Sequence, residues 1–210
     1  MDTIHTQGYQ EGDGQVILSV APLTFSPPLE PWLQSGYGFG DEVTEVCQTD
    51  DKNKRNSCDP MGPRFRKHLG LDARGDVRQD VLAAADGIVV LANTFAKGGK
   101  AIVLEHDMDR DLTTTADRVT TVYEHVDPLV SKGQCVLRGD VIAKIAKVVK
   151  GETSSGPHLH FGFRAHPFDT TSTYGFLPPE GTTGCKACNG NQIVPAFPEY
   201  WKDPQTLFVP

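Results

Sequence analysis

The sequence has no long apolar run. Its longest apolar stretch, VILSVAPLTF at 16–25, is about half the length that a membrane-spanning helix needs, and it contains Pro22. The preceding residues, EGDGQ, are acidic, whereas the start of a secretion signal is basic. We therefore expect neither a membrane span nor a signal peptide in the sequence as given.

Positive charge is also scarce. The formal net charge is −7, and the only run rich in Lys and Arg is KNKR at 52–55. Binding to a phosphate backbone or to an anionic membrane depends on clustered basic side chains. The charge distribution argues against nucleic acid as a partner.

Several motifs of common enzyme classes are missing. The sequence lacks G-x-S-x-G, a P-loop, G-x-G-x-x-G and the H-E-x-x-H pair of thermolysin-like zinc proteases. Nothing in it points to serine hydrolysis or to nucleotide chemistry.

Turn-forming residues are plentiful, with 21 Gly and 15 Pro. Between about 78 and 163, short apolar runs are separated by turn signals at Asp86-Gly87, Gly98-Gly99 and 138–140, and Asp-Gly and Gly-Gly between apolar runs predict hairpins. This spacing predicts a mainly β fold, an antiparallel barrel or sandwich. The segment IAKIAKVVK at 142–150 could instead form one short helical turn.

A chain of 210 residues is long enough for one domain with extensions. We expect an N-terminal extension over 1–35 and a domain over 36–210. Within that domain we place the core at about 36–165, a loop-rich extension with cysteines at about 166–200, and a closing segment at 201–210. Residues 1–60 could also cover a functional site in the domain. In that case, we expect that removing residues 1–30 raises whatever activity the domain has.

The five cysteines bear on the cellular compartment. Cys47 and Cys58 bracket one polar loop, and Cys185 and Cys188 lie in another, which favours two loop disulfides and an oxidising compartment outside the cytoplasm. Cys185-x-x-Cys188 as half a zinc site is the alternative, although no second half is present. Cys135 lies between apolar segments and is expected to be a buried apolar residue.

The strongest local pattern is HLHFGFR at 158–164. In a strand, His158, His160 and Gly162 point to one face, while Leu159, Phe161 and Phe163 point to the other. The two imidazoles would stand about 6–7 Å apart, which suits a metal ligand beside a proton-handling group. A half-exposed strand with ordinary polar histidines is the alternative.

Two further segments add polar groups of the same kind. RKHLGLDARGD holds His68 and Asp72, with Gly70 favouring extended backbone or a turn over a helix, and VYEHVDP places Tyr123 and His125 on one predicted strand face. Hydrolytic zinc sites use three protein ligands from His, Asp or Glu and keep a fourth position open for water. His68, Asp72 and one histidine of the H-x-H pair would meet that requirement.

In this order, H-x-x-x-D at 68–72, Y-x-H at 123–125 and GPHLHF at 156–161 resemble the lysostaphin/LytM-type zinc metallopeptidases, which cut peptidoglycan cross-bridges. The resemblance implies one Zn²⁺ per chain, held by His68, Asp72 and His160, with His125 and His158 as the catalytic pair. It also implies the family's β-rich, partly open barrel of duplicated hybrid motif type, a peptidoglycan peptide substrate, and a periplasmic or secreted location.

Three other readings remain as alternatives. A catalytically silent LytM-like regulator or binding module, with an unknown partner, would keep the fold without the activity. A sugar-transport phosphocarrier also uses a histidine pair, but it needs no Asp72 ligand. DMDRDL at 107–112 spaces its acids like a calcium loop, yet Leu112 stands where such a loop needs Gly, so we expect a solvated hairpin tip.

Overall fold

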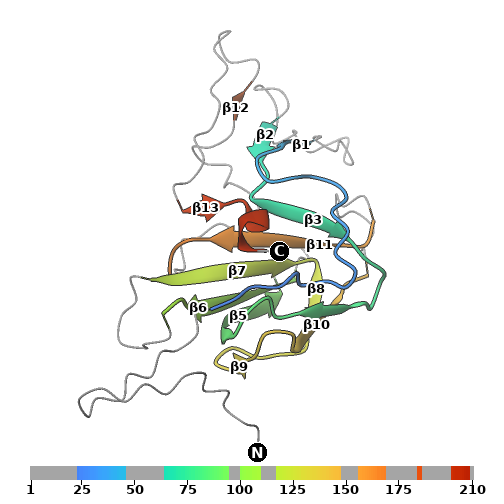
Figure 1. Ribbon diagram of the computed structural model, residues 1–210. Coiled ribbons are helices and arrows are strands. Elements are labelled where there is room, and N and C mark those ends of the chain that lie inside the picture. The colour runs from blue at the N-terminus through green and yellow to red at the C-terminus, as the bar shows by residue number, and fades with distance from the viewer. Residues whose placement is uncertain are drawn as a thin grey trace, which may run out of the picture.

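The computed structural model describes residues 23–45, 64–94, 100–109, 117–147, 156–168, 184–185 and 200–208. Its centre is a seven-stranded antiparallel sheet in the order β13-β11-β7-β6-β5-β9, with β3 also paired to β11 (Figure 1). The strands of this sheet are β3 (Gly70–Arg74), β5 (Gly87–Thr94), β6 (Lys100–Asp107), β7 (Arg118–Glu124), β9 (Cys135–Val136), β11 (His158–Arg164) and β13 (Trp201–Lys202).

Two three-stranded sheets accompany the large one. One is formed by β4 (Asp80–Leu82), β10 (Val141–Ile145) and β8 (Val126–Pro128), and the other by β1 (Glu42–Glu45), β2 (Arg64–Lys67) and β12 (Gly184–Cys185). The helical element of the described residues is one 3-10 turn, η1 (Pro204–Leu207). The sheets do not close on themselves, so the prediction of a mainly β, antiparallel, partly open architecture is confirmed.

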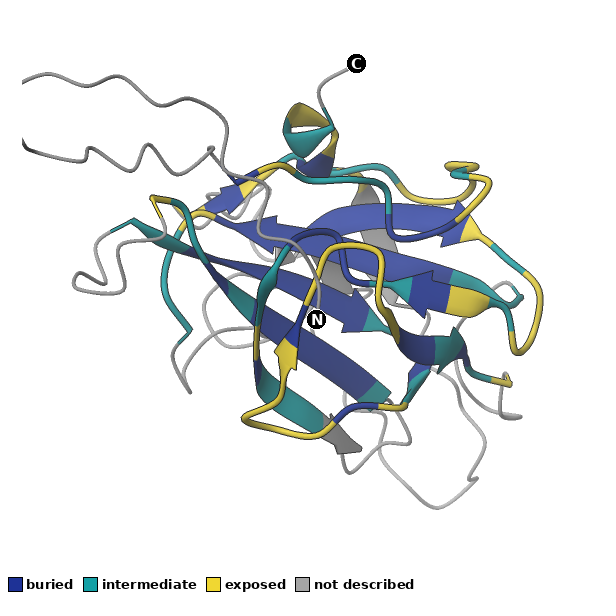
Figure 2. Cartoon of the chain, turned by 60° about the horizontal axis from the view of Figure 1, so that its bottom comes forward, coloured by how far each residue is buried: buried dark blue, intermediate teal, exposed yellow. Residues whose placement is uncertain are grey.

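Alternation along β11 follows the predicted pattern. Leu159 and Phe161 are fully buried and Phe163 is nearly so, and the first two join the main hydrophobic core. That core lies between the large sheet and β10, which contributes Ile142 and Ile145. Figure 2 shows the result as strands that are dark along most of their length, with exposed residues gathered in the connections. The opposite face of the large sheet carries the histidines and a second, smaller apolar cluster.

Residues 23–35 of the predicted N-terminal extension pack against the core. Leu29 is fully buried, Trp32 packs edge-on against Phe161 with ring centroids 6.2 Å apart, and Phe25 lies 6.2 Å from the ring of Phe163. Removing residues 1–30 would therefore take Leu29 and Phe25 out of the core, and burial of such side chains contributes about 1.5–3 kcal/mol each. A cut within residues 1–22 is the one that tests whether this extension limits activity.

Two of the three predicted turns connect strands of different sheets. β4 and β5 flank Asp86-Gly87, but β4 pairs with β10 while β5 pairs with β6 and β9. The prediction of a hairpin there was wrong because the chain crosses the core at Ala83–Ala85, three fully buried small residues that let the backbone pass between sheets. The turn at 138–140 likewise joins two sheets, since β9 belongs to the large sheet and β10 to the sheet with β4 and β8. The possible helical turn at 142–150 is also wrong in its first half, since Val141–Ile145 is a strand.

Cys135 is free and exposed, and not buried as predicted. It lies on the two-residue edge strand β9, where Val136 takes the inward position and Cys135 therefore points outward. The proposed pairs of Cys47 with Cys58 and of Cys185 with Cys188 lie outside the residues whose side chains the structure describes.

A buried chain of hydrogen bonds crosses the core behind the histidine face. The Ala84 N–H donates to the Tyr123 hydroxyl at 2.9 Å, which is bonded to Thr121 Oγ1 at 3.2 Å. Thr121 Oγ1 is bonded in turn to His106 Nε2 at 2.7 Å, and His106 Nδ1–H donates to the Asp86 carbonyl at 2.8 Å. Burial lowers the pKa of His106 to about 4, so this imidazole is neutral in the folded protein.

Acidification is expected to destabilise the metal-free protein through His106. The unfolded chain takes up this proton near pH 6.5 and the folded chain only near pH 4, so stability is present above pH 6.5 and is lost as the pH falls to about 4. The contribution of His106 is at most about 1.4 kcal/mol per pH unit, or about 3 kcal/mol in all. Urea unfolding at several pH values measures it, and His106→Gln should flatten the dependence. An equal dependence in both proteins would contradict the assignment to His106.

Candidate metal centre

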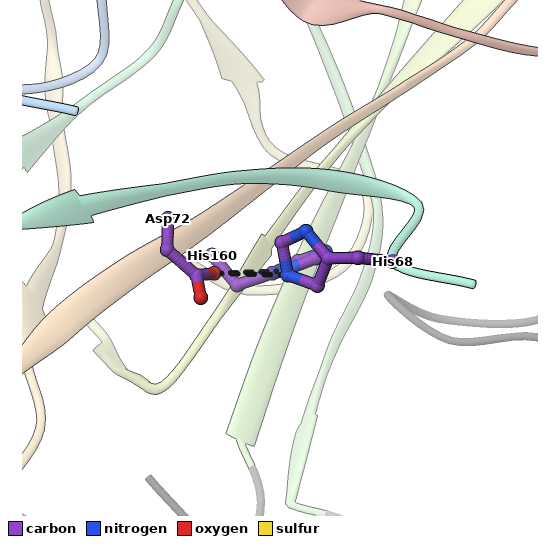
Figure 3. Close-up of side chains that lie close together, drawn as sticks. All are labelled: His68, Asp72 and His160. Atoms are coloured by element: carbon purple, nitrogen blue, oxygen red, sulfur yellow. Dashed lines mark hydrogen bonds and ion pairs between the residues drawn. The ribbon is translucent and has the colours of Figure 1, made fainter. Parts of the chain in front are cut away.

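Three side chains meet on one face of the large sheet, at the paired strands β3 and β11. Asp72 and His160 are direct Cα partners in the antiparallel ladder, so their side chains point to the same side. His68 lies four residues before Asp72 on the segment leading into β3 and reaches the same face (Figure 3). His68 and His160 are fully buried, and Asp72 is nearly so.

The ligand-type atoms of these side chains form a small triangle. His160 Nδ1 lies 2.8 Å from His68 Nε2 and 3.2 Å from Asp72 Oδ1, and His68 Nε2 lies 3.1 Å from Asp72 Oδ1. Ligands at about 2.0–2.1 Å from a tetrahedral zinc ion stand about 3.3–3.4 Å from one another. Two imidazoles and one carboxylate at this spacing therefore fit the protein half of a catalytic zinc site.

Backbone groups of the 36–40 segment orient two of these side chains. The Nδ1–H of His68 donates to the carbonyl oxygen of Gly38 at 3.0 Å, which leaves Nε2 as the lone-pair nitrogen facing Asp72. The Tyr37 N–H donates to Asp72 Oδ2 at 3.4 Å, and Oδ1 is the oxygen turned to the histidines. Sequence patterns could not point to these partners, because they are backbone atoms 30 and 35 residues away along the chain.

The protonation states suit metal binding. Burial raises the pKa of Asp72, but its contacts with His160 and His68 outweigh this and hold the pKa well below its usual range. Burial lowers the pKa of His160 to about 4. At neutral pH the site therefore presents a carboxylate and a neutral imidazole, which are the forms that coordinate a divalent ion.

His125 and His158 stand next to this triangle. Their rings are 4.6 Å apart, and His158 Nε2 lies 3.8 Å from Asp72 Oδ1. The Nδ1–H of His158 donates to the Gly156 carbonyl at 2.8 Å, so its Nε2 is the acceptor nitrogen turned to the site. Burial, followed by the neighbouring His158, lowers the pKa of His125 to about 3.

Tyr123 and His125 do not share a strand face, contrary to the prediction. Tyr123 is fully buried in the core, with its ring 5.2 Å from that of Phe161. β7 ends at Glu124, and His125 follows with a φ of 64°, a left-handed conformation that breaks the alternation of the strand. This turn brings the His125 ring to His158, on the opposite side of the sheet from Tyr123.

Glu124 belongs to the same face and was not predicted. It is the Cα partner of His160, which continues the row from Asp72 through His160 onto β7. Burial raises its pKa to about 7, an effect that His68 opposes and Asp72 reinforces. One sequence feature could have pointed to Glu124, namely that an acidic residue occupies the middle position of Y-x-H, immediately before His125.

Gly70 is expected to be indispensable for this arrangement. A Cβ at residue 70 would lie 2.5 Å from the carbonyl oxygen of Phe161 and 2.7 Å from His160 Nε2, so the strand or the ligand ring would have to move. Gly70→Ala should weaken zinc binding by about 10–100-fold and lower the free energy of unfolding by about 1–3 kcal/mol. Competition with a chromophoric chelator and urea unfolding measure the two effects.

Gly38→Ala is the matched control for Gly70→Ala. Its Cβ would meet nothing closer than Asp41 Oδ2 at 3.4 Å, an ordinary contact, and the carbonyl that accepts from His68 would remain. If Gly70→Ala binds zinc with wild-type affinity, the close packing of the residue 70 backbone against the His160 ring is not what positions that ring.

The fold and the site thus define a mainly antiparallel β protein with a buried His–Asp–His cluster beside a histidine pair. Residues 66–171, half of the chain, match the family model of Peptidase family M23. The chain belongs to this family, which confirms the resemblance to lysostaphin/LytM-type metallopeptidases.

In the described residues, no helix is long and apolar enough to cross a membrane.

Three bacterial peptidases are among the solved structures that this chain matches. An M23 peptidase from Pseudomonas aeruginosa is 21% identical with a TM-score of 0.43, and the match covers 68% of this chain and 45% of that one. A zinc-containing peptidase from Vibrio cholerae is 25% identical with a TM-score of 0.42, covering 75% and 41%. The antimicrobial peptidase lysostaphin from Staphylococcus simulans is 22% identical with a TM-score of 0.46, covering 74% and 50%. The chain thus spans half or less of the length of each.

Proposed function

We propose that this protein is a zinc-dependent endopeptidase that hydrolyses peptide cross-links of bacterial cell-wall peptidoglycan, outside the cytoplasm. The observation that carries the proposal is the convergence of His68, Asp72 and His160 to within 3.2 Å of one another, with a histidine pair alongside. Membership of Peptidase family M23 supports the reaction class.

His68 Nε2, Asp72 Oδ1 and His160 Nδ1 would hold the zinc ion. When bound, zinc supplies an activated water by lowering its pKa towards about 7, and it polarises the substrate carbonyl. Gly38 and Tyr37 keep the first two ligands aimed inward, so the protein does not have to reorganise when the ion arrives.

The histidine pair would manage the proton and the developing charge. His158 is anchored through Nδ1–H to Gly156, so its Nε2 can accept the proton of the attacking water. His125 is kept neutral by burial, and a neutral imidazole N–H can donate a hydrogen bond to the oxyanion of the tetrahedral intermediate. The proton held by His158 would then pass to the leaving amine.

Digestion of purified peptidoglycan sacculi, followed by mass spectrometry of the released fragments, tests the proposal. The wild-type chain should release peptides whose masses identify the bond that is cut, and a chelator should stop the release. A chain that binds one zinc ion but releases nothing would instead match a catalytically silent relative. A chain that takes up no zinc would overturn the proposed function.

A further inference from the structure

Arg74 is the last residue of β3 and a neighbour of the histidine pair. It is the direct Cα partner of His158, in the same ladder that pairs Asp72 with His160. Paired residues of an antiparallel ladder point to one side, with Cβ atoms about 4.5–5.5 Å apart. The Arg74 side chain therefore rises from the same face as His158 and Asp72, and it is exposed where the rest of β3 is buried.

The positive charge of Arg74 is not neutralised within the described part of the chain, where no carboxylate lies within ion-pair distance of it. Several other basic residues of the described part differ in this respect. Arg78 and Lys100 both pair with Asp127, and Lys144 pairs with Asp80. Arg74 is thus a cation beside the site with no ion-pair partner among the described residues.

We propose that Arg74 is a specificity-determining residue that binds a free carboxylate of the peptide substrate. This inference rests on the proposed function. A guanidinium offers two parallel N–H donors that match the two oxygens of a carboxylate, and such charged hydrogen bonds are stronger than neutral ones. Cross-linked wall peptides carry free carboxylates, so a substrate lying across this face can present one to Arg74.

The position of Arg74 limits where that carboxylate sits. From His160 to His158 the strand advances two residues, or about 6.6 Å, and Arg74 stands across from the second of these. The recognised carboxylate should therefore lie within one or two peptide units of the bond that is cut, on the side of the histidine pair.

The test is a binding cycle with two ligands. The ligands are a purified cross-linked muropeptide and the same muropeptide with all its carboxylates converted to primary amides. Two proteins are compared, both as the full zinc-loaded chain. One carries His125→Ala, which slows turnover during the measurement, and the other carries His125→Ala together with Arg74→Met. Calorimetry should show that Arg74→Met weakens binding of the free acid by about 10–100-fold and changes binding of the amide less than about two-fold. Equal changes for both ligands, or no change, would overturn the proposal.

Lys132→Met and Arg74→Lys are the control variants. Lys132 is an exposed cation in the turn before β9, at the far edge of the sheet from β3, and its removal should affect neither ligand. Arg74→Lys keeps the positive charge but lacks the two parallel N–H donors of the guanidinium. It should therefore bind the free acid more tightly than Arg74→Met and less tightly than the protein with Arg74. If Arg74 acted only through His158, Arg74→Met would alter the pH dependence of hydrolysis and not the preference for the acid.

Failure of this inference can be told apart from failure of the proposed function. Sacculus hydrolysis and zinc content are measured on the wild-type chain alone. A wild type that binds zinc and releases peptides, together with no acid-specific loss in Arg74→Met, would overturn only the role of Arg74.

Discussion

Replacing His160 with alanine is expected to abolish stoichiometric zinc binding and to reduce sacculus hydrolysis to the level seen with a chelator. His160 Nδ1 is one of three donors in the site, and its removal leaves only His68 Nε2 and Asp72 Oδ1. Catalytic zinc sites are built from three protein ligands, and two do not retain the ion against a buffer or a gel-filtration column. Metal analysis of the purified proteins measures the change from one ion per chain to none.

Asp72→Asn is the companion variant, because His160→Ala removes a fully buried ring and leaves a cavity. The asparagine has nearly the same shape as aspartate and still accepts from Tyr37, but it lacks the negative charge that offsets the ion. It should fold as the wild type does and still lose most of its zinc. His166→Ala, a histidine that packs on Tyr200 and lies outside the triangle, should keep one zinc ion. Wild-type zinc content in both His160→Ala and Asp72→Asn would refute the assigned ligand set.

Strand geometry made part of the grouping of His68, Asp72 and His160 accessible from the sequence, namely which residues of each segment share a face. Alternation along HLHFGFR put His158 and His160 on one face, and Gly70 favoured an extended segment from His68 to Asp72. Both patterns are local, and the structure places the residues as expected. The resemblance of the three motifs then supplied what alternation cannot, namely that the two segments meet at one site and which histidine of the pair joins His68 and Asp72.

The sequence could not show contacts made by backbone atoms of distant segments or the places where alternation breaks. His125 reaches the site because it is itself a left-handed residue just after β7, and a histidine is only a weak sequence signal for that uncommon conformation. Gly38 supplies a carbonyl, which every residue has. The crossing at Ala83–Ala85 looked like a hairpin, because turn signals show that the chain changes direction but not which strand it pairs with next.

Replacing His125 or His158 with alanine is expected to leave zinc binding intact and to lower kcat by about 10²–10⁴-fold. Neither ring belongs to the triangle, although His158 Nε2 lies 3.8 Å from Asp72 Oδ1. The two imidazole rings are tilted by 55° with centroids 4.6 Å apart, so in the proposed mechanism they act on the same reacting group. The double variant should therefore lose far less than the product of the two single losses, as expected for residues that act as a unit.

The two single variants should differ in their dependence on pH. In His158→Ala the proton acceptor is gone, so the acidic limb of the kcat profile that reports protonation of this base should disappear. In His125→Ala that limb should remain, because His158 keeps its Nδ1–H bond to Gly156 and its accepting Nε2. Loss of the limb in His125→Ala with its retention in His158→Ala would reverse the two roles. Loss of zinc from either variant would instead make it a metal ligand, since a side chain that only moves protons can be removed without releasing the ion.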